Sequence, residues 1–482
     1  MKWAQFGIAM TILTAGHAAM AGDPAVITDE AGRMNRVDQF VRAEMQREKV
    51  PGVALGIVSK GEVIAVKGYG YANVELGVPV TDETIFQSGS VGKQFTAAAG
   101  MLQVEDGKLA LDDSITKYFT DAPESWRPIT VRNLLTHTSG IPDYEANIAN
   151  ASYGTGALDY RRDYTEEELT KIAYGMPLEF VPGSRWNYSN TGYVLLGILV
   201  HKVSGRFYGD VLKDRVFAPL GMETARIISE EDIVPHRAAG YRLVNGQLKN
   251  QEWVSPTMDS TADGSLYLSM LDFIAWDRGL RAHAILKSQS WAQVYTPVVL
   301  KSGKTYPYGF GWNVDESLGK PWYHHGGSWQ GFKTYISRYL ADDLTIIVLS
   351  NLADATPQRF VDGVARILDS RLAQVEPSTP IPDRDPAVTA RVRTLLEAAR
   401  EGKLSPQDLP FIRGGFTEQQ ARHYEEFLRP LGVPRRFDLV ERRALGDDIA
   451  YTYAVLYGDQ TLRVQAGLGP DGRLWQFTIE SD

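Results

Sequence analysis

The chain of 482 residues contains no cysteine. Disulfide bonds, thiolate metal sites and a cysteine nucleophile are therefore excluded. Its eight histidines form neither a His-Glu-x-x-His nor a His-x-His pattern, so we expect no metal site and no cofactor. The chain also lacks a basic excess, because its net charge is −9, and this argues against a nucleic-acid partner.

Long apolar runs are lacking too, and the one short run lies at the N-terminus. Residues 3–15 are mostly apolar but too few to span a bilayer, and Lys2 precedes them. Ala19, Met20 and Ala21 form an Ala-x-Ala cleavage signature. We predict a signal peptide at residues 1–21, with an uncleaved anchor as the alternative. The mature protein is then exported, periplasmic or secreted, without an integral membrane span, and a cysteine-free chain suits an oxidising compartment.

Strand signals cluster at the two ends of residues 22–375. Each end carries two β-rich runs around a polar turn, which predicts one hairpin at each end. We expect one antiparallel sheet closed by both ends of this segment, flanked by helices and with an all-helical lobe inserted in the middle. Residues 262–269 are expected to be a short loop or an edge strand. The predicted hairpins are residues 53–58 with 63–66 and 334–339 with 344–349, and the main predicted helices are residues 34–48, 193–200, 270–280 and 357–372.

A proline-rich segment divides the chain near its C-terminus. Residues 374–386 contain four prolines, and we predict a linker at residues 376–386. Residues 387–482 then form a second, small α+β domain. Its expected helices are 388–401 and 417–428, and its expected strands are 437–440, 449–456, 461–466 and 475–479. The fold class of the whole chain is α/β, of the α+β type.

The most informative motif for chemistry is Ser90-Val91-Gly92-Lys93, where a helix is predicted to begin. Residues three apart share a helix face, so the Lys93 amine can meet the Ser90 hydroxyl. An amine beside a hydroxyl can take its proton, and a free backbone N–H there can bind an oxyanion. The alternative is an ordinary helix cap formed by Ser90.

Three further loops carry candidate residues. Tyr188 and Asn190 form a Tyr-x-Asn pattern, in which a phenol can relay a proton and an amide can orient an amine. His325-Gly326-Gly327-Ser328 stands at the start of a predicted strand, and the paired glycines allow a ligand to approach the backbone. His137 and Ser139 lie in a loop without a lysine partner, so we expect structural roles for both. The alternative for the Tyr188 loop is a loop cap, and the alternative for the His325 loop is a simple turn before a strand.

The sequence does not support a serine hydrolase of the α/β-hydrolase class. The nucleophile elbow of the α/β-hydrolases is Gly-x-Ser-x-Gly, and no serine of this chain has glycine both two before and two after it. Ser328 comes nearest, with Gly326 before it but Gln330 after it.

Residues 34–372 resemble the β-lactamase-related serine hydrolases, which include class C β-lactamases, low-molecular-weight D,D-peptidases, D-aminopeptidases and family VIII esterases. The resemblance rests on several motifs in sequence order, and it implies the β-lactamase/transpeptidase-like fold. The C-terminal residues lie outside it. The motifs are residues 89–96 as the Ser-x-x-Lys box, residues 134–144 as the lobe loop, residues 188–190 as the Tyr-x-Asn box, and His325-Gly326-Gly327 in place of Lys-Thr-Gly.

The resemblance implies a role for each motif. Ser90 is acylated, Lys93 and Tyr188 share the proton transfers, and Asn190 holds Lys93 and contacts the substrate. The backbone N–H groups of Ser90 and Ser328 form the oxyanion hole, beside Gly326 and Gly327. His325 lines the pocket on the strand side. Which of Lys93 and Tyr188 is the base stays open.

His325 stands where class C enzymes carry a lysine, and this affects the expected substrate. A lysine suits the carboxylate of a β-lactam, whereas a histidine with a pKa near 6.5 is mostly neutral at pH 7. We therefore expect an ester or a D-amino-acid peptide or amide as the substrate. The alternatives are a β-lactamase, a penicillin-binding D,D-carboxypeptidase, or an inactive binding protein on this scaffold. Activity on anionic substrates is expected to rise below about pH 6.5 as His325 protonates.

Overall fold

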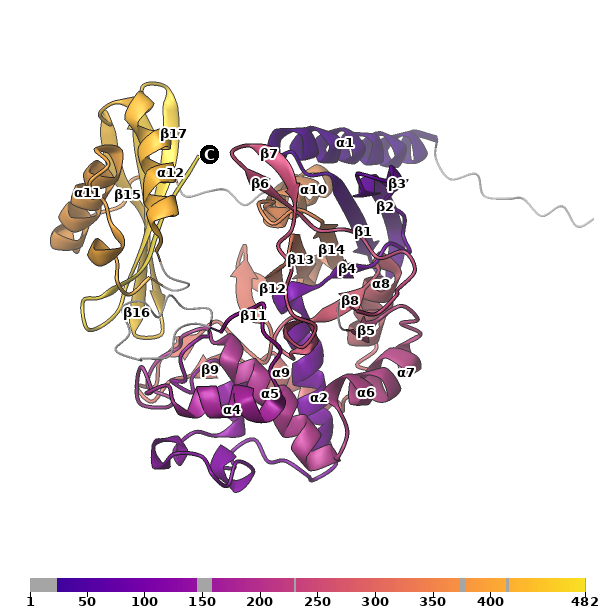
Figure 1. Ribbon diagram of the computed structural model, residues 1–482. Helices are drawn as coiled ribbons and strands as arrows, with labels where there is room; N and C mark the ends of the chain where they lie inside the picture. The colour runs from indigo at the N-terminus through magenta and orange to yellow at the C-terminus, as the bar shows by residue number, and fades with distance from the viewer. Residues whose placement is uncertain (1–23, 145–157, 229–230, 373–377, 413–415, 482) are drawn as a thin grey trace, which may run out of the picture.

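The computed structural model describes residues 24–144, 158–228, 231–372, 378–412 and 416–481 (Figure 1). The predicted signal peptide at residues 1–21 lies outside this range. Among the helices of the described residues, none has both the length and the apolar composition needed to cross a membrane.

A seven-stranded antiparallel sheet forms the centre of the larger part of the chain (Figure 1). Its strand order is β11-β12-β13-β14-β1-β2-β3, so the last strand of the segment, β14, pairs with the first, β1. The prediction that both ends of the segment close one sheet is therefore confirmed. The strands are β1 (Gly52–Ser59), β2 (Glu62–Asn73), β3 (Val78–Pro79), β11 (Asn313–Ser317), β12 (Lys320–Trp329), β13 (Phe332–Tyr339) and β14 (Leu344–Ser350).

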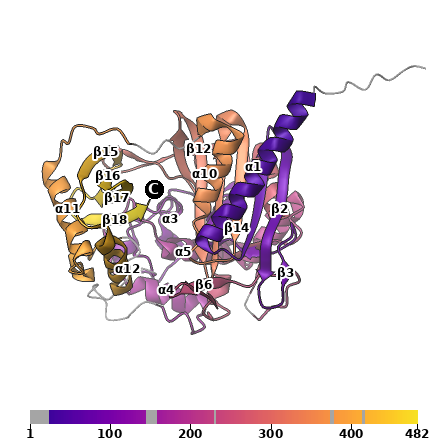
Figure 2. The ribbon, with the colours of Figure 1, turned by 90° about the horizontal axis from the view of Figure 1, so that it is seen from above.

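Two helices from opposite ends of this segment, α1 (Pro24–Glu48) and α10 (Pro357–Leu368), cover one face of the sheet (Figure 2). They pack closely, because a Cβ at Gly363 of α10 would stand 2.0 Å from the Phe40 ring of α1. Alternate side chains of β1 and β14 enter this layer, as a pleated strand requires. Its buried apolar residues include Val37, Val41, Val53, Leu55, Ile57, Ile346, Val348, Phe360, Val361 and Val364.

The other face of the sheet packs against the helices that carry the site. Ala54 and Val58 of β1 point to this side, so both faces of the strand are buried and its sequence is an uninterrupted apolar run. The helices on this side include the predicted all-helical lobe. They are α2 (Lys93–Glu105), α3 (Val131–Leu135), α4 (Glu166–Tyr174), α5 (Asn190–Ser204), α6 (Tyr208–Leu212), α7 (Ala218–Leu220), α8 (Met270–Arg281) and α9 (Ser288–Val294).

The C-terminal domain has its own four-stranded antiparallel sheet and its own core (Figure 1). Two helices pack on this sheet, and their apolar residues meet those of the strands at Val392, Leu396, Tyr453 and Phe477. All six predicted elements of this domain are present. They are α11 (Pro386–Arg400), α12 (Glu418–Leu428), β15 (Arg436–Leu445), β16 (Asp448–Tyr457), β17 (Gln460–Leu468) and β18 (Leu474–Ser481).

Several details differ from the sequence predictions. Helix α1 begins at Pro24 rather than at residue 34. Among residues 30–48, whose burial is described, the first fully buried side chain is Val37, so periodicity marks the part of the helix around and after it. Strand β8 (Leu266–Leu268) is not an edge strand, since it lies between β4 (Phe86–Gln87) and β5 (Arg226–Ile227).

Two hairpins were not predicted. One joins β6 (Tyr241–Val244) to β7 (Gln247–Asn250) through Asn245-Gly246, and the other joins β11 to β12 through Leu318-Gly319. All four turn residues have positive φ, as a two-residue hairpin turn of type I′ requires. Because β12 begins at Lys320, His325 lies inside a strand and not at its start. Two short strands, β9 (Val298–Val299) and β10 (Thr305–Tyr306), complete the fold.

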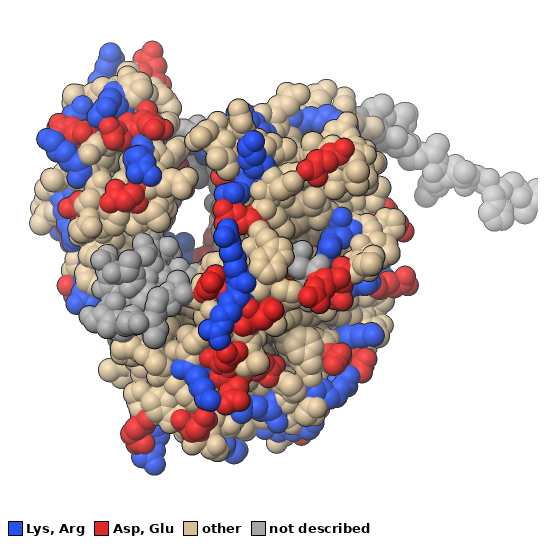
Figure 3. Space-filling model, in the orientation of Figure 1, with Lys and Arg blue, Asp and Glu red and all other residues tan. Residues whose placement is uncertain are grey.

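Charged side chains of both signs are mixed over the face of the molecule seen in Figure 3. This view includes the C-terminal domain and the helical lobe. Because positive and negative side chains are mixed, this face carries no strong electrostatic field of one sign that could steer a charged ligand from a distance.

Candidate functional site

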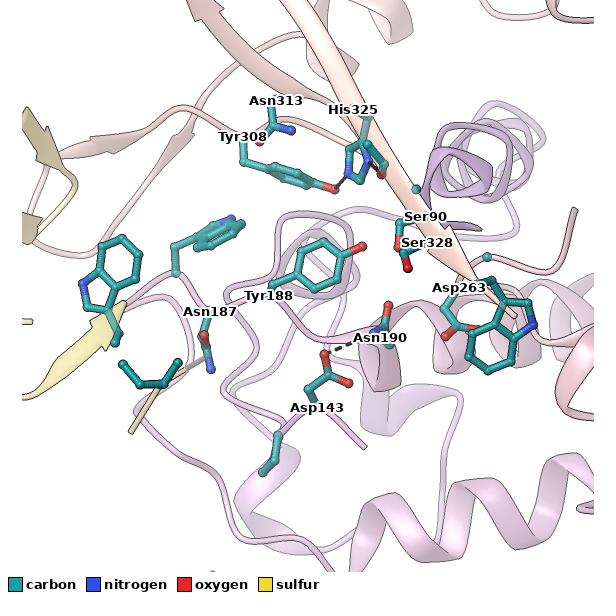
Figure 4. A pocket seen from close by; sticks show the side chains of 18 of the residues that line it. Ser90, Asp143, Asn187, Tyr188, Asn190, Asp263, Tyr308, Asn313, His325 and Ser328 are labelled. Atoms are coloured by element: carbon teal, nitrogen blue, oxygen red, sulfur yellow. Dashed lines mark hydrogen bonds between the residues drawn. The ribbon is translucent and has the colours of Figure 1, made fainter. Parts of the chain in front are cut away.

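A large cavity of about 1130 Å³ opens beside the turn that precedes α2. It is lined by Ser90, by the loop that leads into α5, and by the second half of strand β12 (Figure 4). All of the sequence-predicted site residues except Lys93 line it, and Lys93 lies buried directly beneath. The fold thus brings together four motifs that lie far apart in the sequence.

Ser90 lies in a 3₁₀ turn, η1 (Gly89–Gly92), immediately before Lys93 begins the α-helix. The Lys93 Nζ is 3.0 Å from the Ser90 Oγ, so the expected contact between positions three apart is present. Lys93 is fully buried and also donates to the Asn190 Oδ1, at 2.6 Å, and to the Asp263 carbonyl. The amine is therefore held on two sides by carbonyl oxygens and faces the hydroxyl on a third.

Glycines bring strand β12 unusually close to this turn. A Cβ at Gly327 would stand 2.0 Å from the Ser88 carbonyl oxygen, and a Cβ at Gly89 would stand 2.3 Å from the Ser328 nitrogen. Gly89 also has a φ of +51°, which favours glycine. A Cβ at Gly264 would meet Gly89 from the other side, at 2.9 Å. Any side chain at Gly89 or Gly327 would push the strand away, and the backbone N–H of Ser328 with it.

Tyr188 belongs to an aromatic cluster at the rim of the site. The Lys93 Nζ lies 4.8 Å from the centre of the Tyr188 ring, so the phenol and the amine are neighbours. The centre of the His137 ring lies 4.2 Å from the centre of the Tyr188 ring. Trp186, two residues earlier, stacks on Tyr306 with ring centres 4.0 Å apart. These contacts fix the position of the Tyr188 loop.

Asn190 begins α5 and joins Lys93 to an acidic side chain. Its Oδ1 accepts from Lys93, while its Nδ2 donates to the Asp143 Oδ2 at 3.2 Å (Figure 4). Ser189 caps the helix by accepting from the Gly192 N–H, which places Asn190 on the first turn. Asn190 therefore orients the Lys93 amine and holds the Asp143 carboxylate at the cavity.

His325 is buried and ends a chain of hydrogen bonds that starts at His137. The His137 Nδ1 accepts from the Ser189 N–H, so its Nε2 carries the proton and donates to the Tyr308 hydroxyl at 3.2 Å. Tyr308 donates to the His325 Nε2 at 3.0 Å, and the His325 Nδ1 donates to the Gly326 carbonyl at 2.6 Å. With the hydrogen bonds directed in this way, both histidines are neutral.

The electrostatics of the cluster agree with neutral histidines. Burial lowers the pKa of His325 to about 3, and the nearby Lys93 ammonium adds to this effect. Burial and Lys93 also hold the pKa of His137 well below its usual range. The expectation that His325 protonates near pH 6.5 is therefore wrong, because a buried imidazole without a carboxylate partner cannot be charged cheaply.

The loop residues with expected structural roles behave as predicted. His137 is buried and fixes the Tyr188 loop through Ser189, as a hydrogen bonder and not as a base beside Ser90. Ser139 is also buried and accepts from the Ile141 N–H, which stabilises its own turn.

Comparisons with known proteins agree with this geometry. Residues 37–369 match the family model described as Beta-lactamase. The chain belongs to the β-lactamase family. The match ends before residue 387, which agrees with the extent of the motif resemblance. Family membership confirms the prediction of a β-lactamase-related serine hydrolase with this fold.

Relatives in this family include two kinds of named enzyme. The chain is 30% identical over 308 residues to "Penicillin-binding protein 4*" of Bacillus subtilis, covering 61% of this chain and 67% of that one. It is 31% identical over 348 residues to a "D-aminopeptidase" of Brucella anthropi, covering 70% of this chain and 64% of that one. The chain thus spans about two thirds of the length of these relatives.

A solved structure extends the similarity to the C-terminal domain. The octameric penicillin-binding protein homologue from Pyrococcus abyssi has a TM-score of 0.60 and 26% sequence identity, with 93% of this chain and 98% of that chain covered. A coverage of this size cannot be confined to the residues before 387. The similarity to this structure therefore extends beyond the residues that match the family model.

Three polar residues of the site were not singled out from the sequence. Asp143 and Tyr308 line the cavity and contact Asn190 and His325, and Asp263 holds Lys93 through its carbonyl. Asp143 directly follows the lobe-loop proline, so its place in that motif was an available signal. Asp263 lies in the segment predicted as a short loop or an edge strand, and no motif was found at Tyr308, so only the fold brings these two residues to Ser90.

Proposed function

We propose that this protein is an exported serine hydrolase that forms an acyl-enzyme at Ser90 and cleaves the amide or peptide bond of a D-amino acid, or an ester. The observation that carries this proposal is the buried Lys93 amine 3.0 Å from the Ser90 hydroxyl, at the floor of a large cavity. The D-aminopeptidase relatives support the amide specificity.

Ser90 attacks the substrate carbonyl while Lys93, in its neutral form, takes the hydroxyl proton. Two of the amine hydrogens are held by Asn190 and by the Asp263 carbonyl, so the lone pair of the neutral amine is directed at Ser90. The close approach of Gly89 to Ser328 supports an oxyanion hole made from the backbone N–H groups of Ser90 and Ser328.

The tetrahedral intermediate then collapses and expels the leaving amine or alcohol. Lys93, or Tyr188 beside it, returns the proton to the leaving group, and an ester between substrate and Ser90 remains. Water hydrolyses this ester with the same pair as general base. The 4.8 Å approach of the Lys93 amine to the Tyr188 ring supports a shared role in these transfers.

Charges around Ser90 favour a substrate with a free amine. The carboxylates of Asp143 and Asp263 line the cavity, where they would attract the α-ammonium group of a substrate and repel a carboxylate. His325 is neutral, so it supplies no cation for the carboxylate of a β-lactam. Lys333 also lines the cavity, but its side chain leaves strand β13 on the opposite face from Thr334, whose hydroxyl binds the Ser88 carbonyl beside Ser90. These features favour a D-amino-acid amide over a β-lactam or a D,D-carboxypeptidase substrate.

A matched pair of substrates tests this function. We expect D-alanine p-nitroanilide and p-nitrophenyl butyrate to be hydrolysed, with D-alanine preferred to L-alanine, and nitrocefin to be a poor substrate. Asp143→Asn should lower the ratio of kcat/KM for the D-alanine substrate to kcat/KM for the butyrate, which has no amine, by about 10- to 150-fold, the value of a charge-assisted hydrogen bond. Hydrolysis of nitrocefin alone would contradict the proposal, and so would an inert protein.

A further inference from the structure

The cavity at Ser90 is not formed by the β-lactamase-like part alone. Its outer wall comes from the C-terminal domain, from the segment after α11 and from the turn between β17 and β18. The residues of this wall that matter for the argument are Leu409, Phe411, Ile412, Arg473 and Trp475. The C-terminal domain therefore lies where it can touch a substrate bound at Ser90.

The wall is fixed to the loop that carries Tyr188. Arg185, three residues before Tyr188, binds Asp471 at 3.1 Å and the buried Asp448 at 3.4 Å. Asp471 stands two residues before Arg473 in the same turn. A conformational change in this turn would thus break ion pairs to the catalytic loop.

A second set of contacts holds the tip of the β15–β16 hairpin. The Gly446 N–H donates to the Thr305 carbonyl at 3.0 Å, and Lys304 binds Asp447 at 2.9 Å. Leu445 packs into the aromatic cluster of Trp186 and Tyr308 described above. Together with Arg185, these contacts make the domain a fixed part of the site.

The wall has the chemistry of an apolar subsite. Phe411 is 49% exposed, which is high for so large an apolar side chain, and it lines the cavity. The Arg473 guanidinium lies 4.3 Å from the centre of the Phe411 ring and supports one face of it. The Trp475 ring rests on Gly467 of β17, where a Cβ would stand 2.3 Å from the indole. Both rings are thus backed from within their own domain.

We propose that Phe411 and Trp475 form an extended subsite that binds an apolar, preferably aromatic, group of the substrate far from the scissile bond. This inference deepens the proposed function, because it names the substrate class of the same site. Ser90 and its neighbours bind the reacting carbonyl, and the C-terminal domain selects substrates that are long enough to reach its wall. Small amides and esters then occupy only the inner part of the cavity.

Two esters with the same leaving group test this subsite in the full-length protein. p-Nitrophenyl acetate is short, and p-nitrophenyl 6-phenylhexanoate carries a phenyl group on a chain that extends away from Ser90. The readout is the ratio of kcat/KM for the long ester to kcat/KM for the short one. Trp475→Ala and Phe411→Ala should each lower this ratio about tenfold, which is the scale of one lost aromatic contact.

Phe437 provides a matched control. Its ring lies 4.8 Å from the Arg393 guanidinium, so it forms the same kind of pair within the same domain but does not line the cavity. Phe437→Ala should leave the ratio unchanged. The subsite is overturned if the ratio is the same in the wild type and in the Trp475 and Phe411 variants, or if the Phe437 variant lowers it equally.

Binding of a neutral probe separates this inference from the catalytic proposal. The dissociation constant of 6-phenylhexanamide, measured by calorimetry, should rise about tenfold in Trp475→Ala and in Phe411→Ala. This result would support the subsite even if neither ester were hydrolysed, an outcome that would contradict only the proposed function. Absence of binding to the wild type, or equal binding to all variants, would refute the subsite itself.

Discussion

Gly327 lies so close to Ser88 that a Cβ on the glycine would stand 2.0 Å from the serine carbonyl oxygen. The Thr334 hydroxyl on the neighbouring strand donates to the same oxygen at 2.6 Å. These two contacts hold strand β12 against the turn that carries Ser90. The spacing between the two backbone N–H groups of the proposed oxyanion hole depends on them.

Gly327→Ala should therefore impair catalysis more than the addition of one methyl group would suggest. We expect a loss in kcat on the order of 10² or more, as for a removed oxyanion donor, and a loss of about 1–3 kcal/mol in the free energy of unfolding from overpacking. Gly326→Ala is the control, because its Cβ would meet nothing nearer than the Tyr335 ring at 3.3 Å. Equal kcat losses in the two variants would show that the close approach at Gly327 is not needed for the reaction.

Lys93 and Tyr188 should act as one unit. Lys93→Ala and Tyr188→Phe should each lower kcat by on the order of 10² or more, as expected for groups that transfer protons. Because the amine lies 4.8 Å from the phenol ring, the double variant should lose little more than the worse single variant. Steady-state rates of p-nitrophenyl butyrate hydrolysis by the two single variants and the double variant measure these losses. Losses that simply multiply would mean that the two groups work independently.

Buried neutral histidines should make the protein less stable in acid. The pKa of His325 is lowered to about 3, and burial also lowers the pKa values of His137 and His324. The unfolded chain binds protons at these positions near pH 6.5, and the folded chain does not. The free energy of unfolding is thus at its full value above pH 6.5 and falls below it, by up to about 1.4 kcal/mol per pH unit for each histidine.

Urea unfolding between pH 7.5 and pH 4.5 measures how steeply the free energy of unfolding falls as the pH is lowered. His325→Asn should reduce this slope by the equivalent of about one proton. An identical slope in the wild type and in His325→Asn would mean that His325 titrates in the folded protein. Activity should then rise on the acid side with anionic substrates, which we do not expect.

Residues 22–375 should fold without the C-terminal domain. The two large cores on either face of the seven-stranded sheet contain no residue beyond Leu372, and the C-terminal core contains none before Val388. Among the apolar clusters of the described residues, the one that joins the parts receives only Leu445 from the C-terminal domain. We expect a soluble truncated protein with one cooperative thermal transition. An insoluble truncation beside a soluble full-length chain would show that the division is misplaced.

The parts of the site that were predictable from the sequence are those set by local geometry. Ser90 and Lys93 are three residues apart around one helical turn, so their contact follows from spacing alone. The closure of the sheet followed from the two apolar hairpins. Asn190 was found only through its motif, because nothing local indicates that its amide reaches Lys93 across 97 residues of chain.

The state of His325 was not predictable, because it depends on burial by distant segments. Its neighbours in the sequence are polar or glycine, which suggests an accessible side chain, yet Tyr308 and Tyr188 lie against it and it is buried. The misplaced start of β12 has a related cause. The strand begins with Lys320 and Pro321, which are poor strand formers, and a Leu-Gly turn precedes them.

The central claim is that Ser90 carries the acyl group. The most direct measurement is the mass of the intact protein after mixing with p-nitrophenyl butyrate and with D-alanine p-nitroanilide, followed by peptide mapping of the adduct. The account predicts one acyl group per chain, on the peptide that contains Ser90, and no adduct in Ser90→Ala, which should retain its thermal transition. An adduct on another residue, or turnover by Ser90→Ala within tenfold of the wild type, would contradict it.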